Sequence, residues 1–424
     1  MSKAIIILGM QFGDEAKGSC VDYLCDLHKA SLVVKFCGGH QCCHNVVLEG
    51  GRHHAFAQFG SGTFLGVPTY LGPAFICEPL ALKKEAEVLE KTIDDKILYG
   101  KSLLEYITVD NQSLVTTPFH KALNQIQELS RQKKHGSCGV GIGSTREYWL
   151  AYGKDALVWG DLVSKRASLE KLRLLQQRMI LKCQLYVNTI ETKRIMEFLY
   201  DFNIVKYYGQ ILEIAQQTNP NDAHIFNLRN PSVGNPTIIF EGSQGVLLDE
   251  NFGFHPHTTW STTTDHHAKE IISDWGISDV ETIGVLRTYM TRHGNGPLPT
   301  EQIGKTLAKN ELNASGVWTG QMRYGYFDMN LVKYSLEIQP VDSIFLTHTD
   351  EDPRQVCLEY MKVDGQDVKL EPQLNLEKQE KLTEKLFRVL PKEFVVSSAS
   401  DMLSTLKNIS FISQGPKRKD KVQV

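Results

Sequence analysis

Residues 4–19 constrain the fold more than any other part of the chain. An apolar, largely β-branched run at residues 5–8 passes into a glycine-rich turn that carries Asp14 and Lys17. Such a run before a glycine is typical of a buried strand, and residues 20–27 have the composition of a helix. A strand, a glycine turn and a helix N-terminus together present backbone N–H groups to an anion. We therefore expect a phosphate-binding loop, with a purely structural turn as the alternative.

The turn differs from a Walker A loop. That loop has the order G-x-x-x-x-G-K-[ST], whereas here Gly13 and Asp14 lead to Lys17, Gly18 and Ser19. An acid thus stands where an ordinary phosphate loop needs none, which indicates chemistry beyond phosphate binding.

Charge and hydropathy exclude several classes of protein. The 424 residues have a formal net charge of -3 and 22% charged side chains, so they show no electrostatic signature of a nucleic acid or membrane partner. Apolar runs are too short to cross a bilayer, and the N-terminus lacks a signal-peptide pattern, so we expect a cytoplasmic location. The nine scattered cysteines predict free thiols in a reducing compartment.

Strand-like and helix-like segments alternate along the chain. This alternation predicts an α/β fold with a predominantly parallel central sheet, as in P-loop-like NTPases. Apolar residues recur every three or four positions between 165 and 218, which predicts a helical insertion. We expect a single domain, residues 1–424, with a central sheet from 1–100 and 236–350, a mainly helical lobe at 101–235 and a small C-terminal α+β subdomain at 351–424.

Several later segments carry polar groups. The glycine-rich run at 136–144 suits a loop that closes over a ligand, or else a flexible linker. Residues 290–297 are expected to form a loop, and residues 356–370 a hairpin that turns at Asp364 and Gly365. Asp350 follows a predicted strand and is placed to accept from the N–H groups of a base.

Two groups of histidines and cysteines raise the question of metal binding. The vicinal pair Cys42 and Cys43, which stands between His40 and His44, does not match the spaced pairs of structural zinc sites. The later histidines match neither a helical H-x3-H motif nor a zinc finger; they are His255, His257, His266 and His267. Zinc is therefore the weaker interpretation of both groups, and the threonines near the second suit phosphate binding or helix capping.

Eight separated stretches resemble, in the same order, the motifs of the adenylosuccinate synthetase family. They are residues 11–18, 38–44, 139–143, 240–249, 291–301, 319–325, 346–350 and 412–416. Members of this family transfer the γ-phosphoryl group of GTP to the 6-oxygen of IMP, and aspartate then displaces the phosphate. The resemblance implies a GTP-dependent carbon–nitrogen ligase of purine nucleotide biosynthesis, with residues 351–424 on the guanine side.

The resemblance also implies four catalytic residues. Asp14 matches the base that takes the N1 proton of the hypoxanthine, and it matches a ligand of Mg²⁺ together with the backbone carbonyl at position 43, here Cys43. His44 matches the acid beside the transferring phosphoryl group, and Lys17 neutralises phosphoryl charge. Gln244 matches the glutamine that orients the 6-position of the base.

The remaining ligand contacts follow from the same resemblance. GTP is expected to contact Gly13, Glu15, Ala16, Lys17, Gly18, His348, Asp350, Ser413 and Gly415. The nucleoside monophosphate is expected to contact Asp14, Gln41, Cys138, Gln244 and Thr259. The amino acid is expected to contact Thr319, Gly320, Gln321 and Arg323. The family is homodimeric, so we expect a homodimer.

The chain departs from the family pattern in two substrate loops. Cys138 stands where the family has a hydroxyl, Tyr152 stands near the place of an arginine, and Gln321 replaces the first arginine of the aspartate loop. We predict the ligation of IMP and L-aspartate to adenylosuccinate. One alternative is the same phosphoryl activation with a different purine nucleotide or amine, and a further one is a non-catalytic nucleotide-binding homologue.

Overall fold

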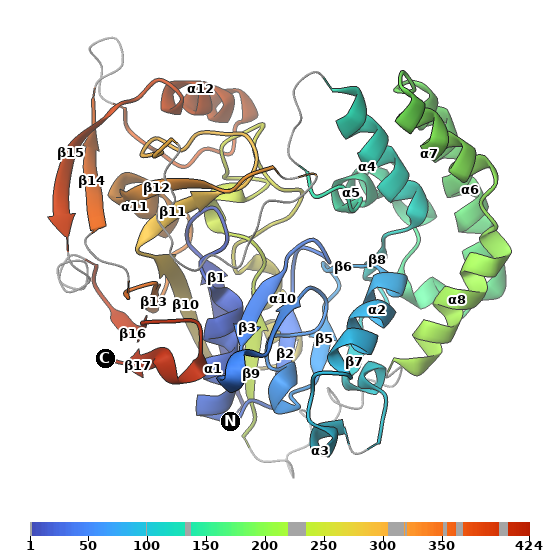
Figure 1. The fold of residues 1–424 in the computed structure, drawn as a ribbon, viewed down its shortest axis with the longest axis horizontal. Coiled ribbons are helices and arrows are strands. Elements are labelled where there is room, and N and C mark those ends of the chain that lie inside the picture. Colours follow the sequence, from blue (N-terminus) through green and yellow to red (C-terminus); the bar gives the residue numbers. More distant parts are fainter. Residues whose placement is uncertain are drawn as a thin grey trace.

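A nine-stranded sheet forms the centre of the protein (Figure 1). The structure is a computed structural model, which describes residues 2–98, 100–131, 137–218, 235–303, 318, 320–350, 354–361, 368–397 and 406–424. In sheet order the strands are β17 (Lys421–Gln423), β16 (Ile409–Ser413), β13 (Ser343–Thr347), β10 (Asp279–Arg287), β1 (Lys3–Gly9), β9 (Thr237–Glu241), β2 (Leu32–Lys35), β5 (Thr69–Leu71) and β7 (Ile107–Val109). Only the edge strand β17 is antiparallel to its neighbour. The predicted α/β fold with a predominantly parallel sheet is confirmed.

Strand β1 lies inside this sheet and is covered on both faces. Ile5 and Ile7 belong to an apolar cluster with helix α1 (Lys17–His28), whereas Ile6 belongs to a second cluster with helix α10 (His266–Asp274). Because successive side chains of a strand point to opposite faces, a strand buried on both sides needs an unbroken apolar run. The run at residues 5–8 meets this need.

Helices form a lobe beside the sheet, on the right in Figure 1. They are α2 (Pro79–Leu89), α4 (Pro118–Ser130), α5 (Ile142–Tyr152), α6 (Lys165–Gln184), α7 (Ile190–Tyr200) and α8 (Ile204–Gln217). The short helix α3 (Asp95–Leu98) lies apart from them, at the lower edge of the view. Helix α4 packs against α6 and α7, and α8 packs against α2 and α6. Leu172, Leu175 and Met179 of α6 are buried in this lobe. Their spacing is the helical period that the sequence shows.

A four-stranded sheet lies on the opposite side, with the order β11 (Tyr289–Arg292), β12 (Arg323–Asp328), β14 (Arg354–Tyr360) and β15 (Pro391–Ser397). Helices α11 (Met329–Ile338) and α12 (Leu376–Leu386) belong to this part (Figure 1). The prediction of a loop at 290–297 is wrong at its start, because β11 pairs with β12. The antiparallel partner of β14 is the distant β15, not a strand of a local hairpin; residues 364 and 365 lie outside the described residues.

The central sheet contains strands from all three of the expected segments of the chain. β7 joins it from the mainly helical segment 101–235, and β16 and β17 join it from the C-terminal segment 351–424. Two small sheets, β3 (His44–Val47) with β4 (His53–Phe56) and β6 (Ile76–Cys77) with β8 (Leu114–Val115), complete the strands described. None of the described helices has the length and apolarity that crossing a membrane requires. All nine cysteines are free.

Candidate active site

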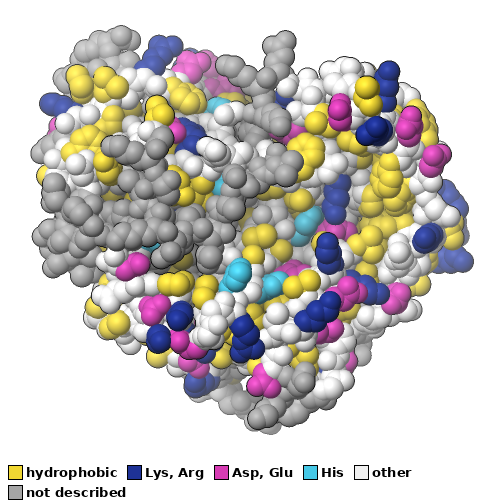
Figure 2. Space-filling model, in the orientation of Figure 1, with side chains coloured by type: hydrophobic (Ala, Val, Ile, Leu, Met, Phe, Trp, Pro, Cys, Tyr) yellow, Lys and Arg dark blue, Asp and Glu magenta, His cyan; other side chains and the backbone are white. Residues whose placement is uncertain are grey.

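A cavity of about 1180 Å³ opens where loops that follow the strands of the central sheet meet the helical lobe. Ligand sites of open α/β sheets form beyond the carboxyl ends of the strands. The residues predicted from sequence that line the cavity are Gly13, Asp14, Ala16, Lys17, Gly18, Gln41, Cys43, His44, Cys138, Gln244, Thr259, His348, Asp350, Ser413 and Gly415. Figure 2 shows histidine side chains near the centre of one face, between the helical lobe and the rest of the molecule. Tertiary structure thus brings the expected base, acid, cation and glutamine into one space.

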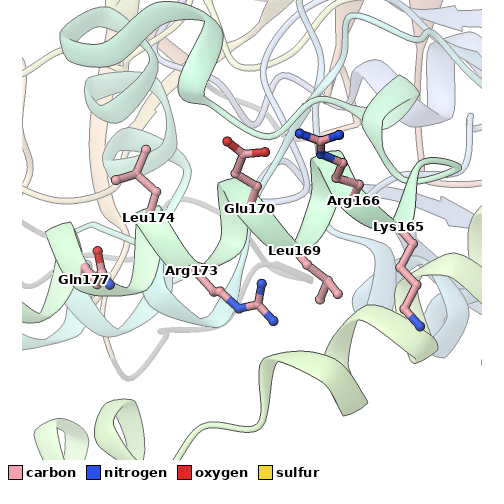
Figure 3. A pocket seen from close by; sticks show the side chains of 7 residues that line it. All are labelled: Lys165, Arg166, Leu169, Glu170, Arg173, Leu174 and Gln177. Carbon is pink, nitrogen blue, oxygen red and sulfur yellow. The ribbon is translucent and has the colours of Figure 1, made fainter.

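Some predicted contacts lie elsewhere. Glu15 is fully buried and does not line the cavity. Gly320, Gln321 and Arg323 do not line the cavity either. Thr319 lies outside the described residues. A depression of about 750 Å³ on α6 contains none of the predicted site residues (Figure 3).

Glu15 holds the loop after β1 from the inside. Its Oε1 atom accepts the backbone N–H groups of Gln11 at 3.0 Å and Gly13 at 2.9 Å, and its Oε2 atom accepts from Lys17 Nζ at 2.6 Å. Asp14 and Ala16 both adopt left-handed backbone conformations, with φ of 62° and 69°. Non-glycine residues rarely adopt this conformation, and the contacts of the buried Glu15 stabilise it here.

Two residues on the wall of the cavity contact Asp14, one at its carboxyl group and one at its backbone. His293 Nε2 lies 3.5 Å from its Oδ2 atom, and Arg287 Nη1 donates to the Asp14 backbone carbonyl at 3.0 Å. Burial raises the pKa of Asp14 above its ordinary value, because desolvation outweighs the opposing charges of His293, Arg287 and Lys17. A raised pKa makes the ionised carboxylate a stronger base.

Lys17 is a buried cation whose charge is retained. Burial alone lowers the pKa of an ammonium group, but the charge and hydrogen bond of Glu15 outweigh it, and Asp14 adds to the effect, so that the pKa of Lys17 is raised. The loop therefore keeps a positive charge next to the expected base.

His44 is paired with Glu241 at the end of β9. Its Nδ1 atom hydrogen-bonds Glu241 Oε1, and the same carboxylate accepts from Ser61 N at 2.9 Å and Ser61 Oγ at 2.5 Å. Burial raises the pKa of Glu241, but the charge of Lys35 and the hydrogen bonds from His44 and Ser61 outweigh it and bring the pKa to about 2. Burial lowers the pKa of His44 despite the opposing effect of Glu241. Glu241 therefore stays ionised and fixes the orientation of the imidazole through Nδ1. The other ring nitrogen, Nε2, does not contact Glu241.

Two glutamine side chains on the cavity wall have unused hydrogen-bonding capacity. The Oε1 atoms of Gln41 and Gln244 are buried, and neither has a hydrogen-bond partner among the described residues. A buried polar atom left unpaired costs free energy. Both side chains therefore fit a cavity that is completed by a polar ligand.

The guanidinium of Arg323 is hydrogen-bonded by other groups of the protein. Its Nε and Nη2 atoms donate to the two carboxylate oxygens of Glu301 at 2.8 and 2.5 Å, and its Nη1 atom donates to the carbonyls of Gly294 and Gly296. This is the bidentate geometry that an arginine also offers to a substrate carboxylate. In the structure, Glu301 occupies that position.

Tyr152, which departs from the family pattern, and the nearby Arg146 both contact neighbouring side chains. The ring of Tyr152 lies 4.0 Å from the Arg178 guanidinium and packs against the ring of Tyr148. Arg146 lies over the Trp149 ring at 4.6 Å and is 3.6 Å from Glu250. Tyr152 and Arg146 are absent from the described cavity wall.

Three ionisable residues around the site have no role in the sequence-based predictions: Glu241, Arg287 and His293. Glu241 and Arg287 are the last residues of the buried strands β9 and β10. A charged residue at the end of a buried strand was a usable signal, because charges are buried only when they are paired or functional. His293 carries no comparable signal, since its proximity to Asp14 depends on the packing of β11 beside the loop.

Comparison with known proteins identifies the family and agrees with the fold. The adenylosuccinate synthetase family model matches residues 6–392. The chain is 30% identical over 379 residues to the adenylosuccinate synthetase of Thermoplasma volcanium, covering 87% of this chain and 80% of that relative. It is 27% identical over 438 residues to that of Francisella tularensis subsp. novicida, covering 98% and 96% of the two chains.

Two solved structures share the fold. Fully ligated adenylosuccinate synthetase from Plasmodium falciparum superposes with a TM-score of 0.73 at 21% identity, covering 99% of both chains. Succinoaminodeoxyadenylate synthetase of cyanophage S-2L, bound to dGMP and to dATP as an energy donor, gives a TM-score of 0.57 at 17% identity, covering 100% of this chain and 95% of the other. The protein is an enzyme of the carbon–nitrogen ligase class. The chain belongs to the adenylosuccinate synthetase family.

Proposed function

We propose that the protein is a GTP-dependent ligase that phosphorylates the 6-oxygen of IMP and displaces the phosphate with L-aspartate to give adenylosuccinate. The observation that carries this proposal is the meeting of Asp14, Lys17, His44 and Gln244 in one cavity. Family membership supports the same reaction. Phosphoryl transfer depends on positioning and on charge stabilisation, and these four residues supply both.

Each residue has a part in the proposed reaction. Asp14 takes the N1 proton, so that the 6-oxygen becomes nucleophilic toward the γ-phosphorus. Lys17 stabilises the charge that spreads over the phosphoryl oxygens. His44, held through Nδ1 by Glu241, would donate from Nε2 toward the transferring group in its protonated, imidazolium form, which the negative charge of the bound phosphates favours. Gln244 lines the same cavity and would hold the 6-position by donating from its amide Nε2 to the 6-oxygen.

Magnesium fits the donor set of the cavity. The side chain of Asp14 and the backbone carbonyl of Cys43 are hard oxygen donors, and both residues line the cavity. When bound there, Mg²⁺ would neutralise phosphate charge on GTP.

The nucleotide contacts predicted from sequence extend this proposal. Asp350 would accept from the guanine N–H groups of GTP, beside His348, Ser413 and Gly415 on the same wall. Gln41, Cys138 and Thr259 would contact the monophosphate. The homodimer remains an expectation based on family resemblance, and the cytoplasmic location remains an expectation based on the short apolar runs and the N-terminal sequence.

A second candidate keeps the chemistry but changes a co-substrate. Arg323 is closed on Glu301, and Gln321 supplies no charge, so the described part of the amino-acid loop offers no unpaired cation to a dicarboxylic acid. The cyanophage relative is bound to dGMP, so a purine other than hypoxanthine is a concrete alternative. The non-catalytic alternative predicts nucleotide binding without turnover.

One assay separates these candidates. Purified protein is incubated with GTP, Mg²⁺, IMP and L-aspartate, and both GDP and the succinyl adduct are followed. We expect both products to form in equal amounts. GDP without the adduct would indicate another amine, and activity with GMP or dGMP in place of IMP would indicate another purine. Absence of GDP with every purine tested would refute all the ligase proposals.

A further inference from the structure

The N-terminal half of α10 carries a cluster of three metal-ligating side chains outside the active-site cavity. The cluster consists of His266, His267 and Glu270, and its candidate ligand atoms all lie within 4.8 Å of one another. His267 Nδ1 lies 2.7 Å from Glu270 Oε2, and His266 Nε2 lies 3.5 Å from Glu270 Oε1. None of the three residues lines the cavity.

The two separations that involve Glu270 are close to those around a bound zinc ion. Ligand atoms at 2.0–2.1 Å from a tetrahedral Zn²⁺ are about 3.3 Å apart. The two contacts with Glu270 lie on either side of this value, and the imidazole rings of His266 and His267 have centroids 5.0 Å apart. The side chains of His266 and Glu270 are more than half exposed. They are therefore free to make the small adjustments that coordination requires.

The surroundings of the cluster also suit a cation. Lys269 is the nearest cation in the sequence, and its Nζ atom pairs with Asp265 Oδ2 at 2.7 Å. The same Asp265 oxygen accepts from Gln339 Nε2 at 2.9 Å. The ammonium group is thus drawn to Asp265 and leaves the carboxylate of Glu270 to the two imidazoles.

We propose that His266, His267 and Glu270 form a surface binding site for a divalent transition metal of the Zn²⁺ type. Two imidazoles and one carboxylate leave a position for water, as in three-ligand zinc sites. Imidazole donors favour Zn²⁺, Cu²⁺ or Ni²⁺ over Mg²⁺ and Ca²⁺, so this site is separate from the proposed magnesium site. The cluster does not match H-x3-H, because its third ligand is a glutamate one helical turn after His266.

The test is calorimetric titration of the chelator-treated full chain with Zn²⁺ in excess Mg²⁺. Wild-type protein should bind about one Zn²⁺ per chain at this site. H266A and H267A should each weaken binding roughly tenfold or more, and E270Q should also weaken it, since even indirect partners of a metal contribute about 10- to 100-fold in affinity. The exposed His53 provides the matched control, because H53A removes an imidazole outside the cluster. Circular dichroism of each variant checks that the helices are retained.

Any of three results would overturn the proposal. The first two concern the cluster itself. They are unchanged zinc binding by the H266A/H267A double variant and no binding by the wild type. The third is loss of binding in a C43S/C138S variant while H267A binds like the wild type, which would assign the zinc to the exposed thiols of the cavity.

Discussion

The imidazole of His44 and the carboxylate of Glu241 form a buried pair, with the two side chains 8% and 0% exposed. The residues are 197 positions apart in the chain. Their pairing fixes the orientation of the ring that we propose as the general acid. In hydrolases and metal sites, a carboxylate behind a histidine has the same positioning role.

Replacing Glu241 therefore tests the orientation of His44. E241Q keeps the size of the side chain but removes the charge that holds the imidazole. We expect kcat for GDP formation to fall about 100-fold, within the range of general acid–base effects, while the Kd for GTP changes little. S61A is the control, because it removes one hydrogen bond to Glu241 and leaves the carboxylate. A normal kcat in E241Q would exclude the positioning role.

The buried pair of Glu15 and Lys17 predicts a large effect on stability. Both side chains are almost completely buried, at 0% and 2% exposure. Removing one partner of such a pair leaves an uncompensated charge, which costs roughly 3–5 kcal/mol. E15Q should lower the free energy of unfolding by about this amount in urea titrations. An exposed pair, Lys381 with Glu377, supplies the control variant E377Q, which should change stability by less than about 1 kcal/mol.

The pair of Arg323 and Glu301 allows a test of the amino-acid site. If a substrate carboxylate competes with Glu301 for the guanidinium, E301Q should lower KM for aspartate by about two- to fivefold, since a partly exposed ion pair is worth about 0.2–1 kcal/mol. R323A should raise the same KM. If both variants raise KM equally, Arg323 only holds the loop at 294–296 through its carbonyl contacts.

Asp328 predicts a specific dependence of stability on pH. It caps α11 and accepts from Tyr360 Oη at 2.7 Å. Burial raises its pKa from 3.8 to about 6, against the opposing hydrogen bonds of Tyr360 and the helix. Because the folded state binds this proton more tightly than the unfolded state, the protonated carboxyl group stabilises the fold. This contribution is fully present below pH 3.8 and is lost as the pH rises through 6.

D328N keeps a capping side chain but cannot ionise. Between pH 4 and pH 8, the free energy of unfolding of D328N should rise relative to that of the wild type by up to about 3 kcal/mol. A shift of two pKa units corresponds to roughly that free energy. Chemical unfolding at the two pH values measures the difference. Parallel curves for the two proteins would contradict the prediction.

Local patterns in the chain were enough to predict a large part of the fold. The run at residues 5–8 predicts a strand covered on both faces, and the spacing of Leu172, Leu175 and Met179 predicts a buried helical stripe. Both predictions succeed because burial selects side chains at the period of the local backbone. The reaction class follows instead from the resemblance of the motifs around Asp14 and Lys17 to those of the family.

Pairings between distant segments depend on the tertiary structure. Strand β14 pairs antiparallel with the distant β15. The sequence does not predict this pairing, because the side-chain pattern of a strand does not specify which neighbour it joins. The contacts of His44 with Glu241 and of Arg323 with Glu301 likewise join separate motifs. Residue types and spacing specify the chemistry that is available, whereas only packing decides which charges meet, because each of these contacts forms between chain segments that folding brings together.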